Sequence, residues 1–273
     1  FISTPNSIIF EKPILHTAAI NNYVFYSNLD SKDSVAQISR DTKCRSNQFY
    51  VNYASLIPKN SYIVAKSGTS NNPKIIGVVK YSYLYCTKTF FHSNLKPGET
   101  NYVTTTKDIS SRLIEGSVLY SSDDEYSWAA RVVSVNGDTR RKGNLKLENL
   151  SNTNLFDLPI YLAKVKLIKP SMDDLNQRDQ IFVLESPNCP MRIKNSINSQ
   201  QTYITVTDNP RLIKNGYHIF SVNPKSDYYD GIIFYHGKKS NHSSFYKLKV
   251  LGNQDITIPD CTTLYKGDNL GTV

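Results

Sequence analysis

The residues with the clearest potential for chemistry are tyrosines that lie among charged and amide side chains. Tyr228 and Tyr229 stand between Asp227 and Asp230 in a turn-rich stretch. A flat apolar ring face beside planar hydrogen-bonding groups is a combination that suits sugar recognition. A second polar turn, residues 67–73, occupies the equivalent place in an internal repeat. The predicted ligand-binding residues are Asp227, Tyr228, Tyr229, Asp230, Lys66, Asn71, Asn72 and Lys74.

A further tyrosine stripe has two interpretations. Tyr81, Tyr83 and Tyr85 alternate along one predicted strand, so all three lie on the same face. They form either an exposed binding surface or a row packed against a neighbouring strand, and we favour packing. Trp128, at the start of another predicted strand, is expected in the core.

Metal and cofactor chemistry is not predicted. His236 and His242 flank a short loop, and His218 precedes them, but no cysteine or carboxylate stands at ligand spacing beside them. The acids at residues 123–125 and 173–174 lack the alternation and the glycine of a calcium loop, so they are interpreted as turn acids.

The sequence also lacks the common signatures of covalent catalysis and phosphate binding. It has neither a Gly-x-Ser-x-Gly elbow nor a glycine-rich phosphate loop. An enzyme whose acids come together only in space stays open as an alternative.

Four cysteines and two glycosylation sequons favour an extracellular location. Cys44, Cys86, Cys189 and Cys261 are widely spaced, and the preferred disulfides are Cys44–Cys86 and Cys189–Cys261. The sequons begin at Asn149 and Asn241. We therefore expect a secreted, disulfide-bonded glycoprotein.

The chain is basic, with a formal net charge of +9. Its longest basic run, residues 140–142, follows turn residues and is interpreted as a solvated hairpin tip. Net charge alone indicates non-specific attraction to anions. Nucleic acid is not the expected partner, whereas an anionic surface or carbohydrate is. No apolar segment is long enough to cross a membrane.

The sequence repeats itself at an offset of about 155 residues. Residues 50–81 align with residues 203–235, and apolar runs separated by Asn, Asp, Ser, Gly and Pro predict β-hairpins. Five hairpins are predicted, within residues 22–38, 61–79, 116–133, 180–193 and 217–235.

These hairpins predict an all-β fold. Tandemly duplicated hairpins must pack on one another to bury their apolar faces, as a β-sandwich, a barrel or a prism-like assembly. The predicted units are residues 1–155 and residues 156–273, the second a diverged duplicate that could interlock with the first.

The first copy resembles a DM9 repeat, the module of certain invertebrate lectins and natterin-type proteins. The resemblance rests on residues 57–64 (IPKNSYIV), 75–79 (IIGVV) and 96–99 (KPGE). It departs from the family at Tyr50, where the family has tryptophan, and in lacking paired glycines and an arginine after the second strand. The resemblance implies sugar binding between hairpins through Asp and Lys side chains, without identifying them here.

The leading hypothesis is a secreted, non-enzymatic protein that recognises carbohydrate or another surface ligand with its hairpin turns. One alternative is an extracellular structural, storage or venom protein that self-assembles through tyrosines and basic charge. The other is an enzyme with a dispersed site. Oligomerisation is compatible with each hypothesis.

Overall fold

The computed structural model describes eleven stretches of the chain, and all structural statements below concern them: residues 7–9, 23–27, 29–68, 73–135, 145–184, 191–194, 203–207, 218–222, 231–235, 245–249 and 255–259. The chain divides into two compact units. Unit 1 comprises residues 1–29, 185–226 and 230–273, and unit 2 comprises residues 30–184 and 227–229.

Unit 2 holds ten described strands, which form one antiparallel sheet in the order β3-β12-β5-β6-β11-β8-β9-β10-β7, with β4 also paired to β11. The strands are β3 (Ala36–Gln37), β4 (Gln48–Tyr50), β5 (Tyr62–Lys66), β6 (Lys74–Phe90), β7 (Thr100–Val103), β8 (Val118–Tyr120), β9 (Trp128–Val135), β10 (Leu145–Asn149), β11 (Pro159–Leu167) and β12 (Gln180–Val183). Two short 3₁₀ turns lie at Ser31–Asp33 and Ser110–Arg112.

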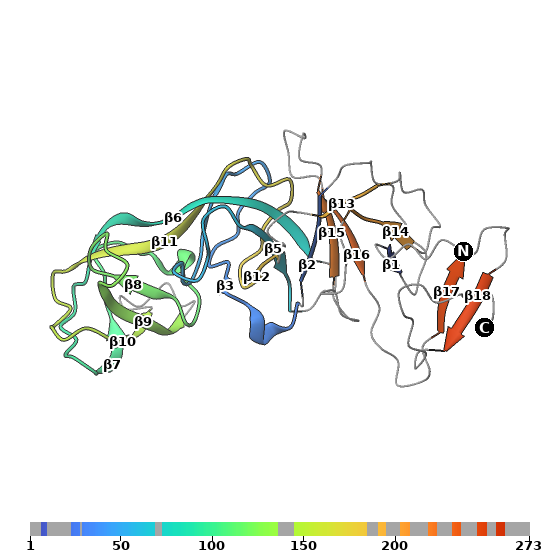
Figure 1. The fold of residues 1–273 in the computed structure, drawn as a ribbon. Helices are drawn as coiled ribbons and strands as arrows, with labels where there is room; N and C mark the ends of the chain where they lie inside the picture. Colours follow the sequence, from blue (N-terminus) through green and yellow to red (C-terminus); the bar gives the residue numbers. More distant parts are fainter. Residues whose placement is uncertain are drawn as a thin grey trace. The chain divides into compact units, whose positions relative to one another are not determined.

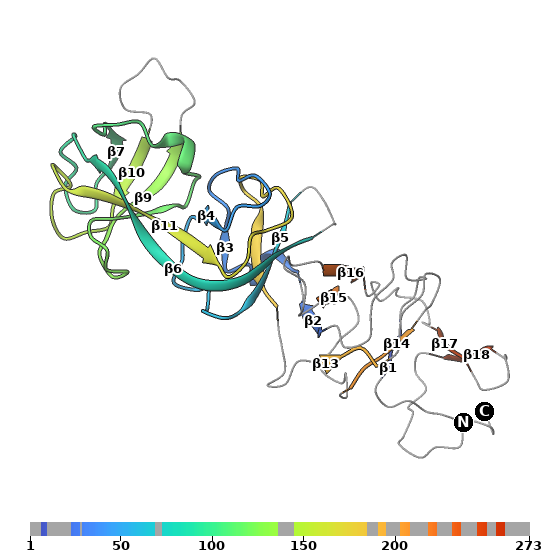
Figure 2. The ribbon, with the colours of Figure 1, turned by 90° about the horizontal axis from the view of Figure 1, so that it is seen from above.

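The long strands β6 and β11 form the middle of this unit. They pair antiparallel from Pro159↔Phe90 to Leu167↔Val79. In both views β7, β8, β9 and β10 gather around one end of this pair, and β3, β5 and β12 around the other (Figure 1, Figure 2). Residues that are 69 (Phe90 and Pro159) to 88 (Val79 and Leu167) positions apart in the sequence therefore become neighbours across one ladder.

The two faces of β11 are buried in different cores. Ala163, Val165 and Leu167 point into a first core with residues of β3, β4, β5, β6 and β12. Ile160 and Leu162 point into a second core with residues of β7, β8, β9 and β10. Because side chains alternate along a strand, each face of β11 is covered along one half only. The uncovered half of each face is where side chains remain accessible.

Hydrogen bonds also link strands that are not adjacent in the sheet order. Ile38, just after β3, bridges to Val51, just after β4. Phe91, just after β6, bridges to Thr105, after β7. Each core is thus bordered by strands on more than one side.

Unit 1 contains short antiparallel sheets. Its described strands are β1 (Ser7–Ile9), β2 (Tyr23–Ser27), β13 (Met191–Arg192), β14 (Tyr203–Thr205), β15 (His218–Val222), β16 (Gly231–Tyr235), β17 (Phe245–Lys249) and β18 (Asp255–Pro259). β1 pairs with β14, β17 pairs with β18, and a four-stranded sheet has the order β13-β2-β15-β16. The all-β class predicted from the sequence is confirmed for the described residues.

Three of the expected hairpins are present, as β5–β6, β8–β9 and β15–β16. The hairpins expected within residues 22–38 and 180–193 are not formed. β2 pairs with β13 and β15, whereas β3 pairs with β12, which also pairs with β5. Turn residues indicate where a strand ends, but they do not determine which strand pairs with it, because strands distant in the sequence can pair with the same edge.

The position near residue 155, where the sequence predicted a boundary between units, lies inside unit 2. β11 follows this position and pairs with β6 and β8, which precede it. The stretch around residue 155 instead supplies Leu155, which is buried in the second core.

Candidate functional site

The candidate site is the uncovered half of one β6–β11 face, which we name the tyrosine–lysine face. Tyr81, Tyr83 and Tyr85 alternate along β6, and the ladder places Tyr83 opposite Lys164 and Tyr81 opposite Lys166 of β11. On the other edge of β11, Tyr50 of β4 also lies opposite Lys164. Directly opposed residues share a face, so all six side chains project to the same side of the sheet.

Lys164 lies between two tyrosine rings at the centre of this face. Its Nζ is 4.3 Å from the ring centroid of Tyr50 and 4.1 Å from that of Tyr85. The two rings meet edge to face, with centroids 6.1 Å apart. Such contacts are favourable cation–π interactions, and they hold the ammonium in one place.

The ammonium of Lys164 has no anionic partner. Within the described residues Nζ makes neither a hydrogen bond nor an ion pair. Burial lowers the pKa of Lys164; the Tyr85 hydroxyl opposes this change, and the charges of Arg112 and Arg40 lower the pKa further. The guanidinium carbon of Arg112 also lies 5.9 Å from the Tyr50 ring centroid. Three cations therefore converge without a carboxylate among the residues described here.

The remaining side chains of the face are held by hydrogen bonds. The Tyr83 hydroxyl donates to Oε1 of Gln48 at 2.7 Å. Nζ of Lys166 donates to Oδ1 of Asn47 at 3.0 Å. Tyr81 meets Tyr83 edge to face at 5.6 Å and remains 43% exposed, and Tyr85 is 37% exposed. The tyrosine stripe thus contacts side chains of the neighbouring strands β4 and β11, as favoured from the sequence, although Tyr81 and Tyr85 also remain accessible.

Two of the eight predicted ligand-binding residues, Lys66 and Lys74, lie within the described residues. Nζ of Lys74 donates to the backbone carbonyl of Asp174 at 2.9 Å, which occupies its ammonium. Lys66 is half-buried at the end of β5. The other six predicted residues lie outside the described residues: Asp227, Tyr228, Tyr229, Asp230, Asn71 and Asn72.

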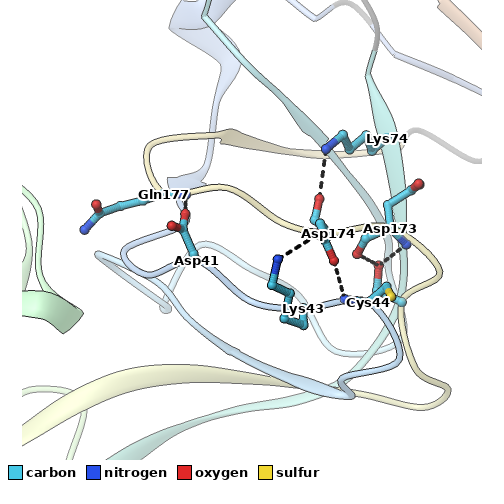
Figure 3. A network of polar contacts seen from close by, with 8 residues as sticks. Asp41, Lys43, Cys44, Lys74, Asp173, Asp174 and Gln177 are labelled. Carbon is cyan, nitrogen blue, oxygen red and sulfur yellow. Dashed lines mark hydrogen bonds and ion pairs between the residues drawn. The ribbon is translucent and has the colours of Figure 1, made fainter.

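Lys74 belongs to a network of polar contacts that joins the loop of Cys44 to the loop of Asp174 in unit 2 (Figure 3). The carboxylate of Asp174 accepts a hydrogen bond from the Cys44 backbone N–H at 2.7 Å and pairs with Nζ of Lys43 at 3.2 Å. The Gln177 backbone N–H donates to Oδ1 of Asp41 at 2.6 Å. These acids satisfy backbone donors in turns, so the prediction that Asp174 is a turn acid agrees with the structure.

The preferred disulfide between Cys44 and Cys86 is not formed, and both thiols are free and exposed. Cys44 contacts Asp174, which also contacts Lys74 near the start of β6. Cys86 lies twelve residues beyond Lys74 on β6, up to roughly 40 Å along an extended strand. A disulfide requires Cα atoms within about 7 Å. Cys189 and Cys261 lie outside the described residues.

The sequon residue Asn149 is buried, with 2% of its surface exposed. Its Nδ2 donates to the carbonyls of Leu95 and Thr153, at 2.8 and 2.9 Å. Its Oδ1 accepts from the backbone N–H and the hydroxyl of Ser151, both at 2.8 Å. All four hydrogen-bonding positions of the amide are used, so a glycan on Nδ2 is incompatible with this arrangement. The second sequon residue, Asn241, lies outside the described residues.

Two further expectations concern single aromatic residues. Trp128 is 43% exposed, so its predicted place in the core is wrong. His218 is buried on β15, with its ring stacked on that of Phe220 at 6.5 Å. His236 and His242 lie outside the described residues. Among the described residues, no three metal-binding side chains come together in one group.

Sequence reasoning missed Lys164, Tyr50, Arg112 and Arg40. A signal for Lys164 was present, because alternation in residues 162–167 predicts one buried and one solvated face. The pairing of β11, which carries Lys164, with β6, which carries the tyrosines, leaves no local signal in the sequence. The sequence therefore could not predict that Lys164 lies beside the tyrosines.

Comparisons of the chain with protein-family models, with curated proteins and with solved structures found no match. The resemblance to DM9 repeats therefore stays a prediction. Among the described residues, no helix has the length and apolar character needed to cross a membrane.

Proposed function

We propose that this protein is a non-enzymatic, lectin-like binding protein that recognises an anionic carbohydrate at the tyrosine–lysine face. The observation that carries the proposal is the half-buried ammonium of Lys164, fixed between Tyr50 and Tyr85 with no anion beside it. Burying a charge without a counter-charge is costly, and Arg112 adds like charge. A carboxylate or sulfate group from a ligand would relieve both costs.

The side chains around Lys164 favour a sugar as the carrier of that charge. Tyr81 and Tyr85 offer apolar ring surface at the rim. Gln48 and Asn47 bring amide groups that can donate to and accept from hydroxyls. Single-stranded nucleic acid needs a series of open ring faces for stacking. Here the ammonium of Lys164 covers one face of Tyr85, and the rings of Tyr81 and Tyr83 pack against each other.

The scaffold that we infer for this face is a pair of small barrels that share β6 and β11. The bridges from Ile38 to Val51 and from Phe91 to Thr105 support it, because each links strands at the border of one core. In such a scaffold the tyrosine–lysine face lies on the outside of the barrel that surrounds the first core. Strands held in closed ladders keep a binding face rigid, which lowers the entropy lost on binding.

An extracellular location is part of the proposal. It rests on the sequon at Asn241 and on Cys189 and Cys261, which lie outside the described residues. The turn residues predicted from the sequence, such as Tyr228 and Tyr229, remain candidates for a separate contact with the same polymer.

Binding of dextran sulfate, compared with uncharged dextran of the same length, tests the proposal. We expect saturable binding of dextran sulfate only, with Lys164→Met raising Kd roughly 10-fold to 100-fold. Methionine keeps an unbranched apolar chain between the rings and removes the charge. The matched control is Lys146→Met, since Nζ of Lys146 also lies over a tyrosine ring, 6.0 Å from the centroid of Tyr102 on β7.

Equal losses in the two variants would mean that net charge alone drives binding, and would overturn the site. Tighter binding of oligo-dT than of dextran sulfate, lost in Lys164→Met, would replace carbohydrate with single-stranded nucleic acid. A glycan array then identifies which acidic sugars bind.

A further inference from the structure

A β-bulge in β9 turns the only tryptophan of the chain out of the core. Leu119 pairs with Ala130, but Tyr120 pairs with Trp128, so Ala129 is an extra residue in the ladder. Ala129 and Ala130 are both buried in the second core, and Trp128 comes to lie opposite Tyr120. Bulges of this kind redirect a side chain and occur often beside functional sites.

Trp128 forms one wall of an aromatic corner, and Tyr53 forms the other. Their ring centroids are 5.8 Å apart and the ring planes meet at 79°. Trp128 is 43% exposed, and Tyr126, two residues before it, is 83% exposed. The two rings meet edge to face, and Trp128 is exposed whereas Tyr53 is half-buried against the first core.

The loop beside this corner is held in a fixed conformation. The Ser121 backbone N–H donates to the Ser127 carbonyl at 3.0 Å, and the Ser127 hydroxyl donates to the Asp124 carbonyl at 2.6 Å. Oδ1 of Asp124 accepts from the Tyr126 backbone N–H at 3.0 Å. Asp124 therefore stabilises the turn, as predicted for an acid in this stretch.

The neighbouring acids Asp123 and Glu125 are exposed and make no hydrogen bond or ion pair within the described residues. Their negative charges contribute to the raised pKa values of two tyrosines, Tyr120 and Tyr161. Burial raises the pKa of Tyr120, and Tyr53 and Glu125 raise it further. The pKa of Tyr161, opposite Tyr120 in the ladder, is raised chiefly by Cys86 and by burial, and also by Asp123. Both carboxylates belong to the loop that immediately precedes Trp128.

We infer that Trp128, Tyr53, Asp123 and Glu125 form a binding site for an organic cation of the alkylammonium class, such as a quaternary ammonium group. Indole and phenol faces attract cations through the ring quadrupole, and aromatic cages recognise quaternary ammonium groups in this way. Carboxylates at the rim add charge complementarity. An anionic ligand would meet repulsion, and a neutral one would leave both carboxylates without a role.

This site is independent of the tyrosine–lysine face. Tyr161 and Lys164 are an odd number of positions apart on β11, so the two sites lie on opposite faces of the sheet. The charges of the two sites are also opposite in sign.

The single tryptophan makes the test direct, because tryptophan fluorescence reports on Trp128 alone. The full chain is titrated with choline chloride at constant ionic strength, and in parallel with 3,3-dimethylbutan-1-ol, a neutral molecule of the same shape. We expect a saturable change with choline in the millimolar range and none with the alcohol. The double variant Asp123→Asn/Glu125→Gln is expected to weaken choline binding about threefold to tenfold.

Glu115→Gln serves as the matched control, since Glu115 is exposed in the same unit and lies outside the corner. It should leave the midpoint unchanged, as should Lys164→Met on the opposite face. Equal responses to choline and the alcohol, a saturable response to neutral sugars as strong as that to choline, or the absence of any saturable change would each overturn the inference. Loss of dextran sulfate binding alone would concern only the tyrosine–lysine face.

Discussion

The ammonium of Lys164 lies 4.1 Å from the centre of the Tyr85 ring, on a face of the sheet where it meets no carboxylate among the described residues. A structural lysine usually keeps its charge in water or pairs it with an acid. Here the chain places the charge between rings and beside two arginines, at a cost to folding. A charged side chain that destabilises the fold at an accessible face is typical of a residue that binds a ligand.

Replacing Lys164 by methionine should therefore leave the fold as stable or more stable while it removes binding. The methylene chain keeps its contact with Tyr50 and Tyr85, and the repulsion from Arg112 disappears. We expect the free energy of unfolding to rise by zero to about 1 kcal/mol, measured by urea denaturation. A loss of several kcal/mol would show that the cation–π contacts are structural, and Lys146→Met provides the scale for an ordinary tyrosine–lysine contact.

Binding of a sulfated polymer should weaken at a lower pH than a normal lysine would allow. Burial and the neighbouring arginines lower the pKa of Lys164 below its usual value of 10.5. The charged form binds the anion, so affinity is present below the folded-state pKa and is lost as pH rises through it. Isothermal titration between neutral pH and pH 10 measures this loss. In Lys164→Met the remaining affinity should not change with pH near the neutral end of that pH range.

The sequence predicted one half of this face and missed the other for a physical reason. Strand periodicity is local, so alternation in Tyr81, Tyr83 and Tyr85 shows that they share a face. Which strand lies beside them depends on ladder pairing between β6 and β11, which are distant in sequence. The predicted core position of Trp128 was wrong for a related reason, because the bulge at Ala129 depends on the register between β9 and β8. The positions of the β-strands could be predicted from the sequence, whereas their pairing partners and the register of each pair could not.

The buried amide of Asn149 should be one of the most sensitive positions of unit 2. Asn149→Ala leaves the Leu95 and Thr153 carbonyls and the Ser151 donors without their partner. We expect a loss of about 3 kcal/mol or more in unfolding free energy, because each buried unsatisfied group costs about 1–3 kcal/mol. Asn152→Ala, at an exposed position three residues away, should change it by less than about 0.5 kcal/mol. Comparable effects of the two variants would contradict the structural role.

Neutralising Asp179 should stabilise the protein at neutral pH. This carboxyl is buried, and burial raises its pKa above 3.8, although the Asn176 backbone N–H and Lys74 oppose the shift and Asp41 adds to it. As pH rises from 3.8 through the higher folded-state pKa, the unfolded chain loses its proton first, so stability falls across this window and stays lower above it. Asp179→Asn keeps an oxygen for the Asn176 N–H and should raise Tm by about 2–4 °C at pH 7. The advantage should vanish below pH 3.8, and Asp173→Asn, at an exposed acid, should show no such change.

Both cysteines of unit 2 should react in the native protein without a reductant. Cys44 lies in an exposed turn beside Asp174, and Cys86 lies on the exposed part of β6 opposite Tyr161. Because the length of β6 separates them, neither can protect the other by oxidation within one chain. Maleimide labelling followed by peptide mass spectrometry is expected to modify both residues fully. The single variants Cys44→Ser and Cys86→Ser should each lose one label and leave the other unchanged. Protection of both thiols, released together by reduction, would show that the chain forms the bond that this arrangement of strands forbids.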